Sequence, residues 1–187
     1  WTIEARIKWC RFSFVSGGRN ALLFLASRFF VYYIILNSHQ TKGTELQTHD
    51  ILLQQMKQEV TRFGVGELQT PGEVDALLAN HKGTALIFVN SVCGCAGGIA
   101  RPALGLAMHH KIKPDVIATV FASSDREATS RAREYFTNMP PSSPSFGLLR
   151  DGKLVHMIHR SDIEIRDAHQ VAGLLTAAFE KHCVSAA

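Results

Sequence analysis

This sequence has few cysteines, almost no excess charge in its main part and no apolar run of membrane-spanning length. Four cysteines in 187 residues are too few for a disulfide-rich secreted scaffold. The formal net charge is +4, but residues 51–187 hold fourteen basic and thirteen acidic residues, so we expect no nucleic-acid partner. No internal repeat or low-complexity segment is present. The composition, 46% hydrophobic and 19% charged, is typical of a globular protein.

The first fifty residues differ from the rest of the chain. Residues 21–36 are apolar except for Ser27 and Arg28, but this stretch is shorter than the about 20 residues that span a bilayer as a helix. Three interpretations stay open: a membrane anchor, an amphipathic segment at a membrane surface, or a stretch that is not native coding sequence. We expect residues 1–50 to be an extension outside the fold and residues 51–187 to form the domain. We expect a cytoplasmic protein, with membrane association only if residues 21–36 are a genuine anchor.

Hydrophobic periodicity and turn residues predict an α/β domain after residue 50. Short apolar runs rich in β-formers predict buried strands, and Asp151-Gly152 between two such runs predicts a hairpin. Alternating helices and strands, followed by a hairpin, favour a central mixed β-sheet flanked by helices on both faces. The expected helices are 50–61, 71–80, 99–110, 125–137 and 162–182, and the expected strands are 84–89, 116–121, 146–150 and 154–158.

Capping boxes mark three of the expected helix starts. In a capping box a Ser or Thr side chain and a Glu or Gln three residues later each satisfy a free backbone N–H group. The candidate pairs are Thr70 with Glu73, Ser124 with Glu127, and Ser161 with Glu164.

Two cysteines one residue apart, Cys93 and Cys95, carry the clearest chemical signal. They lie between a predicted buried strand and a predicted helix, where α/β sheets place their active crevices. The N–H groups at a helix start stabilise an anion, so they lower the pKa of a thiol and favour the attacking thiolate. No Lys or Arg follows until Arg101, so we expect the backbone to supply most of this shift. The pattern predicts a thiol–disulfide exchange site, in which we expect Cys93 to attack and to be the more exposed, and Cys95 to resolve the adduct or stabilise the thiolate. The opposite order of the two roles stays open at this point.

The glycines around the pair fit this interpretation. Gly94 permits a tight backbone between the cysteines, and Gly97 and Gly98 keep the neighbouring surface low for a bulky disulfide. A disulfide across a single residue closes a small ring, and disulfide geometry is demanding, so we expect a labile bond that exchanges readily.

Two other interpretations of the pair stay open. The cysteines could be buried structural residues, although a patch bordered by glycines makes a poor core. They could also bind a metal together with His109, His110 or Cys183, in a metal-binding or thiol-sensing protein. Zinc sites need three or four protein ligands, and no second close pair is present, so we assign no metal ligands.

Three longer stretches resemble the bacilliredoxin family, which consists of thioredoxin-fold proteins with a Cys-Gly-Cys motif. The matching stretches are Glu67–Leu78, Val89–Leu104 and Glu134–Arg160. The resemblance implies a thioredoxin-like fold and an enzyme that reduces mixed disulfides between proteins and the low-molecular-weight thiol bacillithiol. It implies Cys93 as the nucleophile and Cys95 as its partner. Members are also viewed as disulfide isomerases.

The resemblance also implies a substrate-binding loop around Ser143 and Pro144. Pro144 matches the thioredoxin-fold proline that is cis and lies opposite the active-site cysteines, which would leave the Ser143 backbone free to pair with a substrate strand. With Gly94, these residues complete the expected site. We expect no resident cofactor, because bacillithiol or another small thiol would be a co-substrate. The expected partners are that thiol and S-thiolated proteins.

Overall fold

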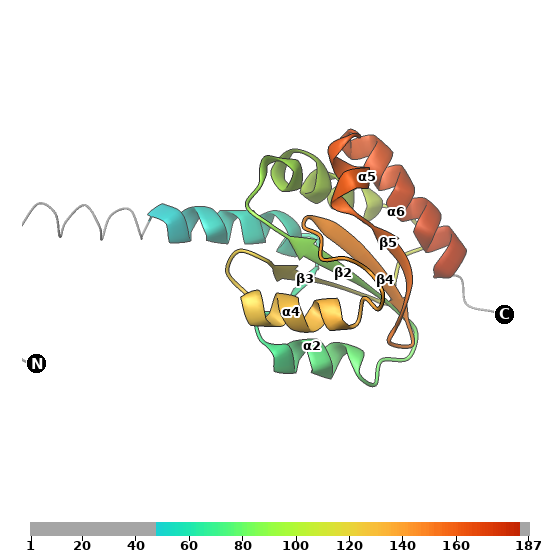
Figure 1. Ribbon diagram of the computed structural model, residues 1–187. Coiled ribbons are helices and arrows are strands. Elements are labelled where there is room, and N and C mark those ends of the chain that lie inside the picture. Colours follow the sequence, from blue (N-terminus) through green and yellow to red (C-terminus); the bar gives the residue numbers. More distant parts are fainter. Residues whose placement is uncertain (1–47, 184–187) are drawn as a thin grey trace, which may run out of the picture. The chain divides into compact units, whose positions relative to one another are not determined.

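The computed structural model describes residues 48–183, which form a mixed sheet with helices on both faces (Figure 1). The sheet has five strands in the order β1-β3-β2-β4-β5. β3 is parallel to both β1 and β2, whereas β4 is antiparallel to β2 and β5 is antiparallel to β4. The predicted α/β class is confirmed. The strands are β1 (Gly66–Glu67), β2 (Thr84–Asn90), β3 (Val116–Phe121), β4 (Ser145–Arg150) and β5 (Lys153–Ile158); the helical segments are residues 48–61, α2 (Pro71–Leu78), η2 (Ala96–Ala100), α3 (Arg101–Ala107), α4 (Arg126–Glu134), α5 (Arg160–Glu164) and α6 (Ala168–His182).

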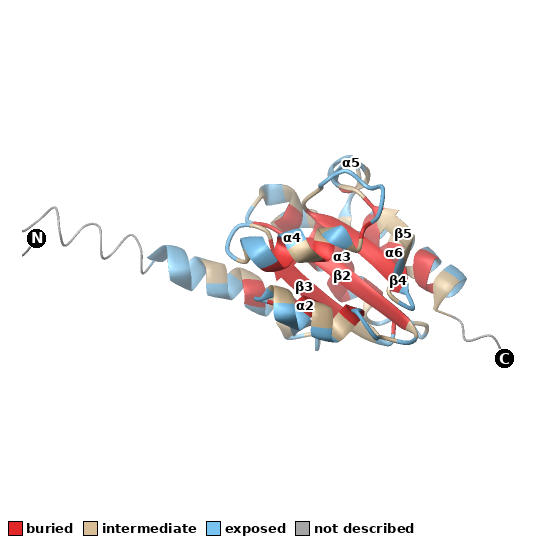
Figure 2. Ribbon diagram, turned by 60° about the horizontal axis from the view of Figure 1, so that its bottom comes forward, coloured by how far each residue is buried: buried red, intermediate tan, exposed pale blue. Residues whose placement is uncertain are grey.

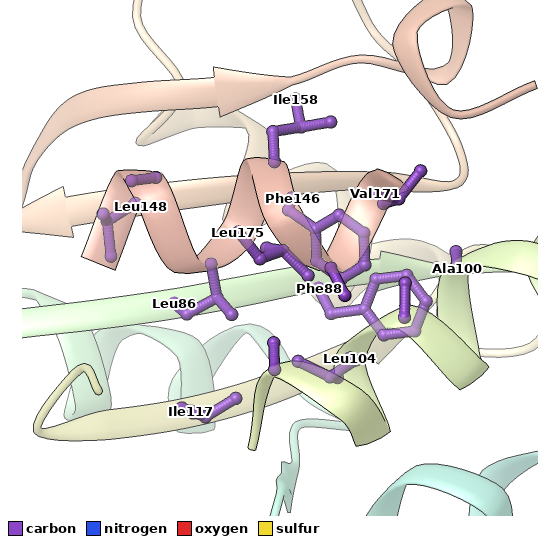
Figure 3. Close-up of a cluster of buried hydrophobic side chains, with 14 of the residues drawn as sticks. Leu86, Phe88, Ala100, Leu104, Ile117, Phe146, Leu148, Ile158, Val171 and Leu175 are labelled. Atoms are coloured by element: carbon purple, nitrogen blue, oxygen red, sulfur yellow. The ribbon is translucent and has the colours of Figure 1, made fainter. Parts of the chain in front are cut away.

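The central strand β2 is buried along its whole length, because helices cover both faces of the sheet (Figure 2). Leu86 and Phe88 face the core cluster that includes α3 and α6, where Phe88 stacks on Phe146 with ring centroids 4.5 Å apart (Figure 3). Ile87 and Val89 face the opposite cluster, which α2 and α4 cover. This alternation confirms the prediction of a strand buried on both faces. The cysteine pair therefore follows a strand that is held in place on both sides.

The predicted capping box is confirmed at α2 and wrong at α4. Thr70 and Glu73 form the box at α2. At α4 the N-cap residue is Asp125, which follows the predicted Ser124. The Asp125 carboxylate makes an ion pair at 3.1 Å with the buried Lys57, which also pairs with Glu67 of β1. This ion-pair network ties the helix over residues 48–61 to β1, a short strand that sequence periodicity did not predict.

The predicted helix over residues 162–182 is interrupted and forms two helices. α6 begins with its own capping box, in which Asp167 Oδ1 accepts from the Gln170 N–H at 2.8 Å and Gln170 Oε1 accepts from the Asp167 N–H at 3.1 Å. The box predicted from Ser161 and Glu164 is wrong, because both residues lie inside α5.

The predictions for residues 1–50 concern a region that lies almost wholly outside the described residues, and the division at residue 50 stays a prediction. The apolar segment over residues 21–36 and Cys10 both fall there. Within residues 48–183, no helix has both the length and the apolar character needed to cross a membrane.

Candidate active site

Three chain segments meet at one edge of the sheet because of the strand register. β2 ends at this edge, β4 begins opposite it with Ser145 paired to Val89, and β5 ends beside β4 with Ile158 paired to Phe146. The cysteine pair after β2, the predicted proline loop before β4 and the residues that follow β5 are therefore brought together. No single stretch of sequence contains this site.

The two cysteine sulfurs are in direct contact. Cys93 Sγ and Cys95 Sγ lie 2.8 Å apart, both residues are partly buried, and both are free thiols. This separation is longer than the about 2.05 Å of a disulfide bond, so the two sulfurs are in contact without a covalent bond. Ser91 Oγ lies 3.1 Å from Cys93 Sγ. Since both cysteines are partly buried, the hydrogen bonds rather than exposure distinguish them.

The surroundings of the pair move the two pKa values in opposite directions. Burial opposes ionisation of Cys93, but hydrogen bonds from Cys95, Ser91 and the Ala96 amide, with the charge of Arg160, outweigh it and lower the pKa of Cys93. Burial and the hydrogen bond and negative charge of Cys93 raise the pKa of Cys95, against the opposing charge of Arg160. In the reduced pair Cys93 therefore ionises more readily than Cys95, and a thiolate is the form that attacks a disulfide.

A helical stretch begins immediately after Cys93, five residues earlier than predicted. Residues 94–107 are helical, with a π-helical turn, η2, between two α-helical parts. The Ala96 and Gly97 N–H groups donate to the Cys93 carbonyl at 3.1 and 3.2 Å. Pro102 lies just beyond the π turn, inside the helical stretch, where proline supplies no N–H group for a helical hydrogen bond. Glycine has a low helix propensity, so the glycines between residues 94 and 98 led to a predicted helix start that is too late.

The expectation that the backbone supplies most of the Cys93 shift is wrong. The Ala96 amide contributes less than the Cys95 thiol and the Ser91 hydroxyl. The nearest basic residue in sequence, Arg101, is buried and donates hydrogen bonds to Glu59, Asn90 and Ser91. The nearby positive charge instead comes from Arg160, which follows β5.

Arg101 holds the loop that carries the cysteines. Its Nη1 donates to Asn90 Oδ1 at 3.2 Å and to the Ser91 carbonyl at 3.0 Å, and its Nε donates to Glu59 on the helix over residues 48–61. A Cβ at Gly97 would lie 2.8 Å from Arg101 Nη2. A side chain at Gly97 would therefore have to displace the end of the Arg101 side chain.

The predicted role of Gly94 in permitting a tight backbone is wrong. The glycines with positive φ among the described residues do not include Gly94, which lies in the first turn of the helical stretch. A Cβ at Gly94 or Gly98 would meet no atom within 4 Å, so both positions face open space. That open space is consistent with room for a substrate beside the sulfurs.

The proline loop has the geometry that the resemblance implied. The Ser143–Pro144 peptide bond is cis. The loop is tied to the residues after β5, because the Arg160 N–H donates to Ser142 Oγ at 2.9 Å and Arg160 Nη1 lies 3.5 Å from the Ser143 carbonyl oxygen. Ser145 Oγ donates to the Ser142 carbonyl at 2.9 Å. The role of Ser143 and Pro144 in binding substrate stays a prediction.

Comparison with known proteins agrees with this geometry. A family model described as disulphide isomerase matches residues 49–183. A bacilliredoxin of Koribacter versatilis is 53% identical over 72% of this chain and 92% of its own length. A bacilliredoxin of Geobacillus kaustophilus is 52% identical over 71% of this chain and 90% of its own length.

This chain belongs to the bacilliredoxin family. It is accordingly a thiol–disulfide oxidoreductase with a thioredoxin-like fold. Among solved structures, a thioredoxin of Fasciola hepatica is similar with a TM-score of 0.46 and 21% identity, covering 63% of this chain and 99% of that one. A thioredoxin of Malassezia sympodialis has a TM-score of 0.47 and 15% identity, covering 64% of this chain and 91% of that one.

The ligands suggested for a metal site in this bacilliredoxin lie far from the cysteine pair. Cys183 ends α6 near Thr84, at the opposite end of β2, and a strand of that length spans roughly 20 Å. His110 pairs with Glu180 at 3.2 Å near the far end of α3. Within residues 48–183, no group of three or more His, Cys, Asp or Glu side chains could hold a metal ion.

Two residues of the bacilliredoxin site were not predicted to act there. Ser91 lies two positions before Cys93, so a hydrogen bond between its hydroxyl and the Cys93 sulfur could have been predicted from the sequence. Arg160 lies far along the chain from the cysteines and reaches them only because β5 ends at the same sheet edge. No local pattern could have identified it.

Proposed function

We propose that this protein removes bacillithiol from mixed disulfides with proteins, with Cys93 as nucleophile and Cys95 as resolving thiol. The observation that carries the proposal is the asymmetric contact between the two sulfurs, in which Cys93 has a lowered pKa and Cys95 a raised one. Relatives of 50–53% identity are called bacilliredoxins, which supports bacillithiol as the small thiol.

In the first step the Cys93 thiolate attacks the bacillithiol sulfur of the mixed disulfide. A new S–S bond forms between Cys93 and bacillithiol, and the bond to the target protein breaks. The electron pair leaves with the target sulfur, which takes a proton from solvent. The loop that holds Ser143 precedes β4 at the sheet edge where β2 ends, which supports binding of the target as an extended segment there.

In the second step Cys95 resolves the adduct. Its thiol loses a proton, and the thiolate attacks Cys93 Sγ, which forms the Cys93–Cys95 disulfide and releases bacillithiol. The raised pKa of Cys95 keeps it protonated until the negative charge on Cys93 has been removed by the first step. A small-thiol or protein-dithiol reductant returns the pair to its reduced state and is oxidised in its place.

The test uses the full-length protein and its Cys95→Ser variant. The variant, incubated with a protein–bacillithiol mixed disulfide, should retain one bacillithiol on Cys93, detected by peptide mass spectrometry. The wild type should release the target thiol roughly tenfold faster from bacillithiol than from glutathione mixed disulfides. No adduct on Cys93 would contradict the assigned mechanism, and equal rates would contradict the bacillithiol preference.

A disulfide isomerase activity is the second candidate, favoured by the description of the matching family model. A substrate protein with two scrambled intramolecular disulfides and no small thiol separates the two functions. Reactivation of this substrate faster than removal of bacillithiol would favour the isomerase.

A further inference from the structure

A surface pocket without an assigned ligand is lined by Arg160, whose charge acts on both cysteines. Its volume is about 650 Å³, within the range of small-molecule sites. Residues 140–143 of the proline loop line one side, and residues 159–161 with Glu164 line the other. The pocket therefore joins the substrate loop to the segment that follows β5.

Of the residues that line this pocket, Arg160 is the one with a permanently charged basic side chain. Its side chain is half-exposed, its Nε donates to Glu164 Oε2 at 3.0 Å, and its Nη1 lies 3.5 Å from the Ser143 carbonyl oxygen, at the outer limit of a hydrogen bond. A guanidinium has five N–H donors and binds carboxylates in a forked geometry. The Nη groups can therefore receive an anionic ligand while Nε stays on Glu164.

We propose that Arg160 binds a carboxylate of the small-thiol half of the mixed disulfide, so that the pocket selects acidic thiols. This inference rests on the proposed function, because attack by Cys93 leaves the small thiol attached to Cys93, beside the pocket. The pocket's neutral serine and proline surface provides space for the rest of the thiol. The target protein need only supply the disulfide and an extended segment.

Glu164 sets the strength of this selection. Its carboxylate stays on Nε and offsets the positive charge of the guanidinium that the ligand would contact, so the resting pocket carries little net charge from this pair. Removal of the Glu164 charge should strengthen carboxylate binding, and removal of the Arg160 charge should abolish it. Two substitutions therefore have opposite predicted effects on one selectivity ratio.

The ratio of rates for an acidic and a neutral substrate also separates carboxylate binding from the effect of Arg160 on the pKa values of the cysteines. The positive charge of Arg160 lowers the pKa of both thiols, so its loss slows exchange with every substrate. A matched pair of substrates cancels this common effect. The probes are a short neutral peptide whose cysteine carries 4-mercaptobutanoate and the same peptide carrying 4-mercaptobutanamide.

The measurement is kcat/KM for both probes with wild type, Arg160→Gln, Glu164→Gln and, as a control on another helix, Arg131→Gln. We expect the wild type to prefer the carboxylate by roughly fivefold, Arg160→Gln to show no preference, and Glu164→Gln to raise it. Arg131→Gln should keep the wild-type ratio, and salt should reduce it.

An unchanged ratio in Arg160→Gln, or no carboxylate preference in wild type, would overturn the inference. A bacillithiol-bearing protein assayed in parallel tests the proposed function separately. Failure of that assay with a ratio that still depends on Arg160 would reject bacillithiol as the substrate and leave acidic-thiol binding in place.

Discussion

The two ends of β2 each place a partly buried thiol beside polar groups, but the surroundings act in opposite directions. At the carboxyl end, hydrogen-bond donors and Arg160 lower the pKa of Cys93 despite burial. At the amino end, burial and the carboxylate of Asp115 raise the pKa of Cys183, although Thr84 and Arg150 oppose this. Asp115 accepts from the Thr84 N–H at 2.7 Å and from Thr84 Oγ at 2.9 Å.

This difference shows that a cysteine becomes reactive through its place in the sheet. At the carboxyl end of β2, hydrogen bonds from Cys95 and Ser91 stabilise the Cys93 thiolate, and the Ala96 amide and the charge of Arg160 add smaller contributions. At the amino end of β2, the Asp115 carboxylate accepts a hydrogen bond from the Thr84 N–H group. Its negative charge disfavours a thiolate nearby. Substitutions at the two ends of β2 should therefore have unequal effects.

Loss of the nucleophile should have the largest effect. Cys93→Ser should reduce the rate of exchange roughly a thousandfold or more, because a serine hydroxyl does not ionise at neutral pH and cannot replace a thiolate. Cys183→Ser is the matched control and should stay within about twofold of wild type, since it lies at the opposite end of β2. Similar losses of exchange rate in the two variants would contradict the claim that only the thiol at the carboxyl end of β2 is reactive.

The amino end should be the more sensitive to an added methyl group. Gly83 has φ +106° and an added Cβ would lie 2.5 Å from Asp115 Oδ2, so Gly83→Ala should lower the free energy of unfolding by about 3 kcal/mol. Gly98→Ala is the control, because its Cβ meets no atom within 4 Å, and it should be neutral or slightly stabilising. Urea denaturation measures both. Equal stability of the two variants would refute the packing argument.

Removal of the buried guanidinium at the carboxyl end should destabilise both the fold and the site. Arg101→Met loses the bonds to Asn90, Ser91 and Glu59 and should cost about 2 kcal/mol of unfolding free energy. Arg131→Met, which breaks a partly exposed ion pair with Asp75, should cost less than about 1 kcal/mol. Chemical denaturation of both variants decides this, and an Arg101→Met protein as stable as wild type would exclude the positioning role.

The Ser91 hydroxyl should have the smallest effect, visible in the pH profile of alkylation. Cys93 has a lowered pKa, so its thiolate persists to lower pH than an ordinary thiolate; Ser91→Ala removes a donor and should move the midpoint upward. The iodoacetamide rate of Cys93 at pH 7 should fall roughly threefold. Cys183, with its raised pKa, should react only at higher pH in both proteins. A midpoint that moves downward in Ser91→Ala would contradict the assigned hydrogen bond.

Much of the fold and the centre of the site could be predicted because their signals are local. The apolar run of β2 indicated a strand buried on both faces, and Asp151-Gly152 indicated the β4–β5 hairpin. The helix starts were less predictable, because Asp125 and Asp162 had alternative partners: Asp125 pairs with Lys57, and Asp162 Oδ2 accepts from the His159 N–H at 3.0 Å. A capping motif read from spacing cannot reveal such competing contacts.

By itself, the sequence determined the mixed α/β architecture and the Cys93–Cys95 pair between strand and helix. These depend on side-chain periodicity and on residue types within a short window. Which charge acts on the pair depends on the three-dimensional arrangement, because the order of the strands brings Arg160 to this edge, whereas Arg101 is buried. This arrangement also separated Cys183 and the pair to opposite ends of β2. Electrostatic interactions act through space, so sequence distance did not predict which groups tune the nucleophile.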